Sequence, residues 1–591
     1  MTRLVRYLRP YRRRIAWAVL AMTTVALFNG TAVLLLKPIV DRIFIAKDFR
    51  MLWFAVAGLP LLVALKSAAS YAQNYLMSWL GQKITQDVRA DLFRQLHALP
   101  LEYYCDHEGG ETLSRVTSDL VVVQAAMNSL PLYLIRDTMT VVVLLCSLFY
   151  LDWRFALLSL IGVPLTATVL LVLGRKMRAT SLESQAVLGR IHQRFQETIQ
   201  GLGVIRAFNY EDAMLAKFEE ENELFFSPTM SFLRATALAA PLMEFSGGLV
   251  AAVILYFGGC EVILGRLTPG AFFAFLGAFF AAYAPIKNMA RSNSELQRAL
   301  ASSDRIFQLL DEHPASSLPG DSVTAFEGLR QGIRLDSVSY KYPGRTEPAL
   351  DRCTLTIPAG KRTAVVGPSG SGKTTLAQLL LRLYEPGTGA VLFDGVDART
   401  LDPRSLRARI GLVSQSTLLF HDTVLENVAL GRRVVTVSEV ERACRLSGAA
   451  EFVERLPDGY HTRLGDAPPR LSAGQRQKLA LARVVLKDPA IVILDEATAN
   501  LDAASEDEVL SALRGLFRGR TVVMIAHNLM ALPDVDHVIV LNQGQVAESG
   551  TPEELLARKG LFRRLYDLQK AAGAASPAPA RSPEPPVTEK A

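Results

Sequence analysis

The stretch GPSGSGKTT, from Gly367 to Thr375, decides the fold of the second half of the chain. It matches the phosphate-loop pattern, GxxxxGK followed by Ser or Thr. The apolar run 363–366 precedes the stretch and the helical run 376–383 follows it, which is the strand, loop and helix setting that the pattern requires. The alternative is a glycine turn that only caps a helix.

Each polar or flexible position of this stretch has a role in holding phosphate. Gly367, Gly370 and Gly372 let backbone N–H groups turn toward phosphate oxygens. Lys373 can reach the β- and γ-phosphates, and the Thr374 hydroxyl can ligate Mg²⁺. The predicted phosphate-binding set is Gly367, Ser369, Gly370, Ser371, Gly372, Lys373, Thr374 and Thr375.

Length and composition predict two large units, one of them in a membrane. The chain has 591 residues and 50% hydrophobic content, with a mean hydropathy of +0.22. Single cores stop growing near about 250 to 300 residues. The net charge of +7 is assigned to residues that flank membrane segments, because no basic, aromatic-interleaved face indicates nucleic acid. The five cysteines are scattered, so neither a zinc site nor a disulfide framework is predicted.

Six apolar segments occupy the first 290 residues, each near the ~20 residues that span a bilayer. Buried helices of a soluble protein could mimic one or two of them, but not six. Two long stretches between segments, 81–131 and 174–238, are predicted to continue the helices into the cytoplasm. The segments are Ile15 to Leu36, Met51 to Leu80, Leu132 to Leu151, Phe155 to Leu173, Ala239 to Cys260 and Pro269 to Lys287.

Arginines near the amino terminus predict the orientation in the membrane. They place that end in the cytoplasm, and six crossings return the chain to the same side. Basic residues in the first external loop, such as Lys47 and Arg50, argue weakly against this orientation. The arginines are Arg3, Arg6, Arg9, Arg12, Arg13 and Arg14.

The rest of the chain divides into a linker, a second domain and a tail. We predict a transmembrane domain over 1–290, a polar linker over 291–331 and a nucleotide-binding domain over 332–570. In the last of these, short β-branched runs alternate with helical patterns, which favours a parallel α/β sheet. The Pro/Ala-rich tail, 571–591, is predicted to be disordered.

A second motif, LSAGQRQ at Leu471 to Gln477, identifies a family. With both motifs in place, the chain resembles exporter half-transporters of the ATP-binding cassette (ABC) family, of type IV, over all but the tail. The resemblance implies an all-α six-helix membrane domain fused to an α/β P-loop nucleotide-binding domain. It also implies ATP and Mg²⁺ as cofactors and, because one chain carries one cassette, a domain-swapped homodimer.

The resemblance assigns roles to further residues. Glu496 would polarise the attacking water, with His527 and Gln415 as the other catalytic residues. Asp495 would hold Mg²⁺ together with Thr374 and Gln415. Taken singly, Gln415, His527 and Tyr342 have plain alternatives: a surface Gln, a helix-capping His and a core Tyr. The order and spacing of the three residues favour the functional roles. The remaining assignments are Tyr342 on the adenine, Asp502 in the D-loop, and Leu471, Ser472, Ala473, Gly474 and Gln475 in the signature loop that caps the partner's ATP.

Three departures from the family pattern concern turnover and coupling. Ala473 replaces a usual glycine and adds a Cβ where the backbone should approach phosphate. Asp466, followed by a Pro pair, stands where Glu and Gly are usual, and Asn528 stands where Arg is common. They leave the catalytic assignments intact.

The membrane half resembles the lipid A flippases, the MsbA branch of the family, through LLKP at 35–38, TLSRVTSD at 112–119 and IQGLGVIRAF at 199–208. In that branch, basic residues contact the phosphates of the lipid, and these residues correspond here to Lys66, Arg136 and Lys287. Lys66 lies about 22 Å down segment two, and Lys287 about 27 Å down segment six. Their level is predicted to be that of the cytoplasmic leaflet, where an anionic head group would enter.

The alternative for these cations is snorkelling to the interface, or pairing with Asp137 or Glu244. The function implied is ATP-driven flipping of lipid A or lipopolysaccharide core across the bacterial inner membrane, with the cassette cytoplasmic and with no nucleic-acid partner. A multidrug or hydrophobic-compound exporter, and an ATP-gated channel or regulator, stay open as alternatives. Six spans exclude a soluble DNA-repair ATPase.

Overall fold

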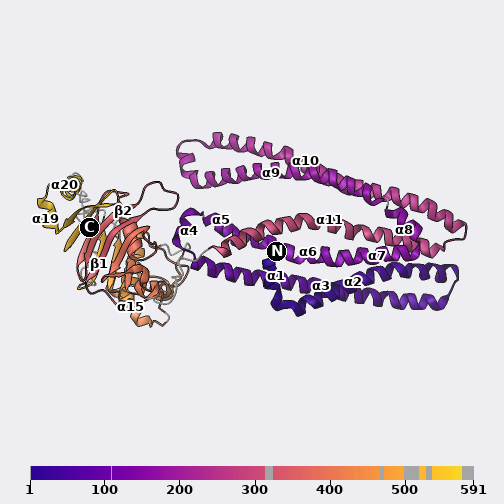
Figure 1. Cartoon of the computed structure of the whole chain (residues 1–591), viewed down its shortest axis with the longest axis horizontal. Helices are drawn as coiled ribbons and strands as arrows, with labels where there is room; N and C mark the ends of the chain where they lie inside the picture. The colour runs from indigo at the N-terminus through magenta and orange to yellow at the C-terminus, as the bar shows by residue number, and fades with distance from the viewer. Residues whose placement is uncertain are drawn as a thin grey trace, which may run out of the picture. The chain divides into compact units, whose positions relative to one another are not determined.

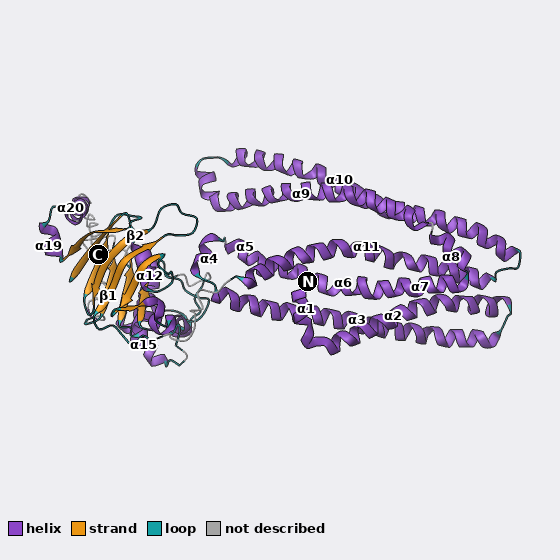
Figure 2. Ribbon diagram, viewed as in Figure 1, coloured by secondary structure: helices purple, strands orange, loops and turns teal. Residues whose placement is uncertain are grey.

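The computed structural model describes residues 2–107, 109–160, 162–312, 324–432, 434–465, 471–497, 515, 518–526 and 535–574. The chain forms two compact units, which Figures 1 and 2 show as long helices and as sheets with short helices. The helical unit consists of Met1–Arg94 and Leu113–Asp311. The α/β unit consists of Gln95–Thr112 and Glu312–Ala591, so a short piece of the amino-terminal half belongs to it.

Long helices make up the helical unit, and three π-helical stretches (η2, η3 and η4) interrupt them. The elements are α1 (Thr2–Leu8), η1 (Arg9–Tyr11), α2 (Arg12–Pro38), η2 (Ile39–Ile45), α3 (Phe49–Ala98), η3 (Arg115–Asp119), α6 (Leu120–Pro131), η4 (Leu132–Asp137), α7 (Thr138–Leu151), α8 (Trp153–Leu160), α9 (Gly162–Ala207), α10 (Glu211–Ile263) and α11 (Pro269–Asp311).

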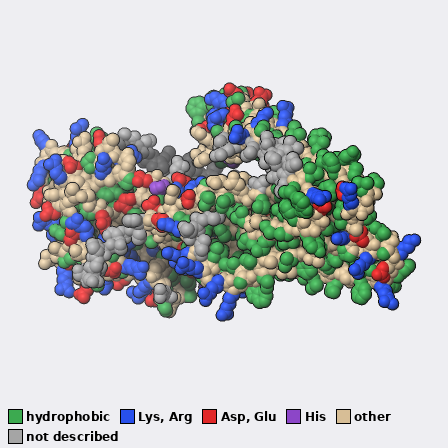
Figure 3. Space-filling view, turned by 45° about the vertical axis from the view of Figure 1, so that its right-hand side comes forward, with side chains coloured by type: hydrophobic (Ala, Val, Ile, Leu, Met, Phe, Trp, Pro, Cys, Tyr) green, Lys and Arg blue, Asp and Glu red, His purple; other side chains and the backbone are tan. Residues whose placement is uncertain are grey.

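Five helical stretches among the described residues are long and apolar enough to cross a membrane: Arg6–Ile45, Phe49–Ala98, Gly109–Leu151, Glu211–Ile263 and Pro269–Asp311. Apolar side chains gather over the long helices in Figure 3. The most apolar window of α3 has no buried residue, as expected of a surface that faces lipid or another chain. The predicted fourth segment, Phe155 to Leu173, contains Ile161, which lies outside the described residues. The count of six therefore stays a prediction.

An apolar cluster and one carboxylate join α2, α7 and α11. Leu144, Phe275 and Ala278 are buried together in this cluster. Where α2 ends and α11 begins, Asp41 accepts hydrogen bonds from the Gly270 N–H and the Thr268 hydroxyl, both at 2.7 Å. A carboxylate at a helix amino terminus satisfies unpaired N–H groups and complements the helix dipole.

Helices α9 and α10 form a hairpin that packs mainly on itself (Figure 2). Arg194 of α9 pairs with Glu221 of α10 at 2.9 Å, and the Ser184 and Thr229 hydroxyls lie 2.8 Å apart. Phe208, at the turn of the hairpin, is 78% exposed.

The α/β unit contains two sheets. A four-stranded antiparallel sheet has the order β2-β1-β4-β5, and a six-stranded sheet has the order β10-β9-β3-β8-β7-β6. Strands β9, β3, β8, β7 and β6 are parallel, as predicted from the alternating pattern, and β10 is antiparallel to β9. Apolar side chains of both sheets share one core with α12.

The strands are β1 (Gly332–Tyr340), β2 (Leu350–Pro358), β3 (Arg362–Val366), β4 (Thr388–Phe393), β5 (Val396–Asp397), β6 (Ile410–Val413), β7 (Ile491–Asp495), β8 (Thr521–Ile525), β9 (His537–Asn542) and β10 (Gln545–Gly550). The helices are α4 (Leu101–Asp106), α5 (Gly109–Ser114), α12 (Lys373–Leu380), η5 (Ala398–Thr400), α13 (Pro403–Ala408), α14 (Val424–Val428), α15 (Val437–Leu446), α16 (Ala450–Val453), η6 (Gly459–His461), α17 (Ala473–Lys487), α19 (Pro552–Ala557) and α20 (Leu561–Ala574).

Two predicted boundaries fall inside helices. The start of the predicted linker, at residue 291, lies within α11, which continues to Asp311 because Ala299, Ile306 and Leu309 form a buried face. The start of the predicted tail, at residue 571, lies within α20, and residues 575–591 lie outside the described part of the chain.

We expect Gly270→Ala to destabilise the helical unit. A Cβ at this position would lie 2.5 Å from Asp41 Oδ1 and would also meet the Lys37 carbonyl oxygen. Overpacking of this kind costs roughly 1–3 kcal/mol. Gly259→Ala, also in a long helix, is the control, because a Cβ there has no atom within 4 Å. Thermal unfolding in detergent should show a lower midpoint for Gly270→Ala alone; equal midpoints would contradict the tight contact.

Candidate functional site

The phosphate loop lies between β3 and α12, at the carboxyl end of the parallel sheet. Two of its glycines, Gly367 and Gly372, are required by space as well as by backbone conformation. Gly367 has φ 154° and a Cβ there would clash with the Leu541 carbonyl oxygen, while Gly372 has φ 99° and a Cβ would lie 2.5 Å from the Ala349 carbonyl oxygen. Ser369 and Gly370 are exposed, so the loop backbone is open to a ligand.

Lys373 lies against its own loop. Its Nζ donates to the carbonyl oxygens of Gly367 at 2.9 Å and Pro368 at 2.8 Å. Burial lowers the pKa of Lys373, whereas the nearby Glu496 and Asp495 act in the opposite direction. The ammonium group therefore lies between carbonyl dipoles and two carboxyl groups, where phosphate oxygens can replace the carbonyls.

Two acidic residues at the end of β7 face this lysine. Burial raises the pKa of Asp495, and the neighbouring Glu496 raises it further. Glu496 has φ 48°, a strained conformation for a residue with a side chain, and its Oε2 accepts a hydrogen bond of 2.6 Å from Gln415 Nε2. Gln415 follows β6, so the ends of two strands bring these groups together.

Unpaired buried atoms show that these residues fit a metal-bound nucleotide. Asp495 Oδ1 and Ser371 Oγ are buried without a hydrogen-bond partner in the described part of the chain. Thr374, at the start of α12, is exposed. Mg²⁺ takes carboxylate and hydroxyl oxygens together with substrate phosphates, so Asp495 and Thr374 have the chemistry that such an ion requires.

Tyr342 stands beside the loop, on an aromatic cluster. Its ring packs edge-on against Tyr340 at 5.0 Å and Tyr384 at 5.5 Å between centroids. Its hydroxyl lies 3.1 Å from Thr375 Oγ1 and donates to Gln378 Oε1 at 2.8 Å, both on α12. Burial raises the pKa of Tyr342. The ring is thus fixed relative to the phosphate loop.

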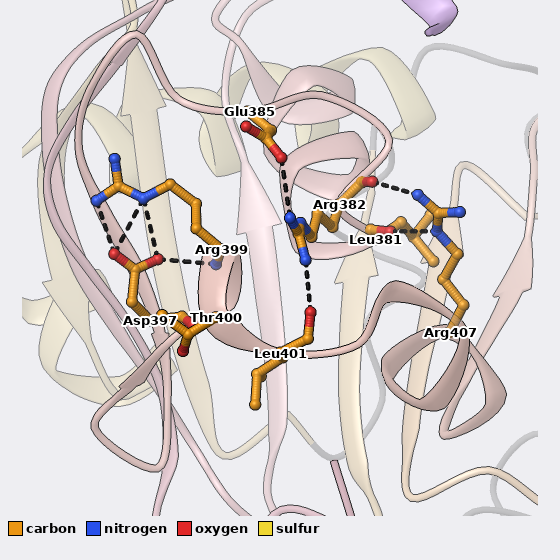
Figure 4. Close-up of polar contacts among 8 residues, drawn as sticks. All are labelled: Leu381, Arg382, Glu385, Asp397, Arg399, Thr400, Leu401 and Arg407. Atoms are coloured by element: carbon orange, nitrogen blue, oxygen red, sulfur yellow. Dashed lines mark hydrogen bonds and ion pairs between the residues drawn. The ribbon is translucent and has the colours of Figure 1, made fainter. Parts of the chain in front are cut away.

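Two arginines fix the chain segment that carries Tyr384 (Figure 4). Arg407 donates to the carbonyl oxygens of Leu381 at 3.1 Å and Arg382 at 2.5 Å. The buried Arg382 side chain donates to the Leu401 carbonyl oxygen at 2.6 Å. Charged donors satisfy the carbonyl groups just beyond α12 and hold this turn in place.

The signature loop begins a helix. Ser472 caps α17 and forms a capping box with Gln475, with bonds of 2.9 and 3.2 Å. Ala473 is the first residue of α17 and is not among the residues with positive φ. The backbone at this position therefore does not need glycine. The site assignments His527 and Asp502, and the departures at Asp466 and Asn528, lie outside the described residues.

Comparison with known proteins agrees with this geometry. The model described as ABC transporter transmembrane region matches residues 16–284, and the model described as ABC transporter matches residues 350–499. A protein named ATP-dependent lipid A-core flippase from Syntrophus aciditrophicus is 36% identical over 567 residues, 96% of this chain and 94% of its own length. The chain belongs to the ABC transporter family.

Proteins of the same name from other bacteria have a similar degree of identity to this chain. The relative from Desulfotalea psychrophila is 37% identical and covers 95% of this chain and 97% of its own length. The relative from Thiobacillus denitrificans is 36% identical, with 96% and 98% covered. This ABC transporter therefore joins a helical transmembrane region to an ATPase domain within one chain, as predicted.

One element of the ATPase unit was not predicted. Helix α4 belongs to this unit although it lies in the sequence of the membrane half. Cys105 Sγ lies 3.3 Å from the Tyr384 hydroxyl, which packs on Tyr342. Burial raises the pKa of Glu102, and the nearby Glu385 raises it further. The aromatic run LEYYCD at 101–106, among polar loop residues, is the signal that could have indicated a docked helix.

The structure brings two of the three predicted substrate cations to one level. Asn288, next to Lys287, donates to Asp137, next to Arg136, at 3.0 Å. Lys66 lies farther toward the amino-terminal end of α3 and not at the level of the other two cations. Met77 of α3 shares an apolar cluster with Ile135 of η4, and Lys66 lies eleven residues before Met77, about 16 Å along the helix.

We expect Tyr342→Ala to raise the ATP dissociation constant roughly 5- to 150-fold, because stacking of an aromatic ring on a base is worth about 1–3 kcal/mol. Tyr342→Phe keeps the ring and loses only the hydroxyl bonds to Thr375 and Gln378, so it should bind ATP more tightly than the alanine variant. Titration with a fluorescent ATP analogue measures both. Equal losses would exclude stacking by this ring.

Proposed function

We propose that this protein uses ATP hydrolysis to move the lipid A-core from the inner to the outer leaflet of the bacterial inner membrane. The observation that supports it most is the match over nearly the whole length to relatives named lipid A-core flippases. The intact set of Lys373, Asp495 and Glu496 supports a hydrolysing pump rather than a gate. The cassette faces the cytoplasm, where ATP is available.

The residues of the site have distinct roles in hydrolysis. Lys373 leaves the loop carbonyls and stabilises the charge of the β- and γ-phosphates. Asp495 and Thr374, with Gln415, would hold Mg²⁺, which would supply positive charge to neutralise the phosphates. Glu496, released by Gln415, would orient the attacking water, and the family resemblance assigns a supporting catalytic role to His527. Ser472 and the amino terminus of α17 cap the ATP of the other cassette.

A homodimer is required because one chain supplies one cassette and one signature loop. The exposed apolar turn of the α9–α10 hairpin supports a domain-swapped arrangement, since the Phe208 side chain is 78% exposed. On the α/β unit, Leu418 is 67% exposed and Phe420 is 47% exposed. We assign these two as the surface of one protomer that receives Phe208 of the other. ATP-driven closure of the cassettes then shifts the membrane helices from inward to outward access.

Lipid A should stimulate ATP hydrolysis by the purified protein in nanodiscs, with Glu496→Gln as the inactive reference. Replacing Lys66, Arg136 and Lys287 together with alanine should abolish the stimulation, because the head-group phosphates lose their cations. Stimulation by amphipathic drugs but not by lipid A would instead favour the drug-exporter alternative. Stimulation that persists in the triple variant would exclude these three cations.

We expect a disulfide between Phe208→Cys on one protomer and Leu418→Cys on its partner. The exposed cysteines Cys105, Cys146 and Cys260 are first replaced by alanine. Two differently tagged chains, each with one new cysteine, are co-expressed and oxidised, so that only contact between chains gives a mixed dimer on a gel. Val434→Cys, at an 88% exposed position, replaces Leu418→Cys as control. Equal yields from both pairs would contradict the domain swap.

A further inference from the structure

Asp137 is a buried carboxylate inside the helical unit, only 2% exposed. Arg136 Nε donates to its Oδ1 at 2.7 Å, and Arg136 Nη2 lies 2.7 Å from the same oxygen. The other oxygen, Oδ2, accepts a hydrogen bond of 3.0 Å from Asn288 Nδ2. Both carboxylate oxygens are therefore occupied, one by a cation and one by a neutral amide.

Local backbone geometry makes this pair possible. Neighbouring residues of an α-helix do not face each other. Arg136 and Asp137 end the π-helical stretch η4, which follows Pro131 and changes the directions of successive side chains. π-Helical turns occur often at functional sites. On one side, η4 packs through Ile135 on the apolar cluster of α2 and α3; on the other, Asn288 ties Asp137 to α11.

The ion pair with Asp137 weakens the attraction of Arg136 for an anionic ligand. A charge inside a membrane protein is stabilised by a partner, and here that partner is already present in the protein. The Arg136 side chain nevertheless stays 22% exposed, so a ligand can approach it. The charges of Arg136 and Asp137 cancel, whereas Lys287, next to Asn288 on α11, forms no ion pair within the described part of the chain.

We infer that Asp137 is a specificity-determining counter-ion of the lipid site, which competes with the head group for Arg136 and so selects lipids with two phosphates over lipids with one. This inference rests on the proposed function. A lipid with one phosphate is satisfied by Lys287 and gains little from a guanidinium that is already paired. A second phosphate can compete with the carboxylate for Arg136, because charged donors bind phosphate in the same fork geometry.

A carboxylate that competes with lipids for Arg136 suits the membrane in which the protein would work, because that membrane also contains other anionic lipids. Specificity is a difference between affinities, and an element that penalises the wrong ligand contributes to it as much as a new contact to the right one. Singly charged phospholipids surround any such site in large excess. If Arg136 were unpaired, two cations at one level would attract them as well.

The test compares lipid A, with two phosphates, and monophosphoryl lipid A in nanodiscs of a neutral lipid. For each lipid, the concentration that gives half-maximal stimulation of ATP hydrolysis (KM) is measured with the natural protein, with Asp137→Asn and with Glu261→Gln. Glu261→Gln is the matched control, since it removes the acid of another ion pair of the helical unit, with Arg266 at 3.3 Å. The ratio of the two KM values reports selectivity, and a general structural defect would leave this ratio unchanged.

In the natural protein we expect monophosphoryl lipid A to have the higher KM, by at least about tenfold, which corresponds to ~1.4 kcal/mol. Asp137→Asn should bring the two values together by lowering the KM for the monophosphoryl lipid, and Glu261→Gln should keep the natural ratio. In an Arg136→Gln background, Asp137→Asn should have no effect on the ratio, because the carboxylate acts through the guanidinium.

A second variant keeps the test decisive if Asp137→Asn does not fold. Arg136→Lys preserves both charges, but a lysine is a point charge without the planar fork that holds the carboxylate, so selectivity should narrow in the same direction. An unchanged KM ratio in the folded variants, with normal stimulation of the natural protein, would overturn this inference alone. Absence of any stimulation by lipid A in the natural protein would overturn the proposed function and the inference with it.

Discussion

The charge balance around Lys373 is the constraint on which the ATPase unit depends. One buried ammonium group faces Asp495 and Glu496 and is held by two loop carbonyls. Among the described residues, one oxygen of Asp495 has no hydrogen-bond partner, and burial disfavours the charge of this carboxylate. A nucleotide with its metal ion would supply both the anion for the lysine and the cation for the aspartate. Binding of Mg-ATP would therefore balance the charges of both groups together.

Most of this site could be predicted from the sequence because each residue follows the end of a parallel strand. The phosphate loop follows β3, Gln415 follows β6 and Asp495 ends β7. The carboxyl ends of parallel strands meet at one edge of the sheet, so local patterns are enough to bring these groups together. The Ser472 capping box is local for the same reason. The resemblance to a family supplied roles that spacing alone does not give.

Contacts between residues far apart in the sequence could not be predicted in this way. The aromatic run at 101–106 could indicate a docked helix, but it does not show that Cys105 lies beside Tyr384, 279 positions later, or that α4 belongs to the ATPase unit. The polar stretch after residue 291 was predicted as a linker because its composition is polar. Its buried residues, Ile306 and Leu309 among them, recur with helical spacing, and packing continues α11 to Asp311.

A count of residues along separate helices predicts the positions of the membrane cations but not their partners. Counting places charges along each helix axis, but the partner of Arg136 depends on the π-helical turn and on Asn288 from another helix. This partner bears on transport as well as on binding. A pump must release its cargo, and a cation whose only possible partner is the cargo would retain it. If the lipid binds Arg136 as proposed, Asp137 gives the guanidinium a partner to return to, and release of the lipid would expose no unpaired buried charge.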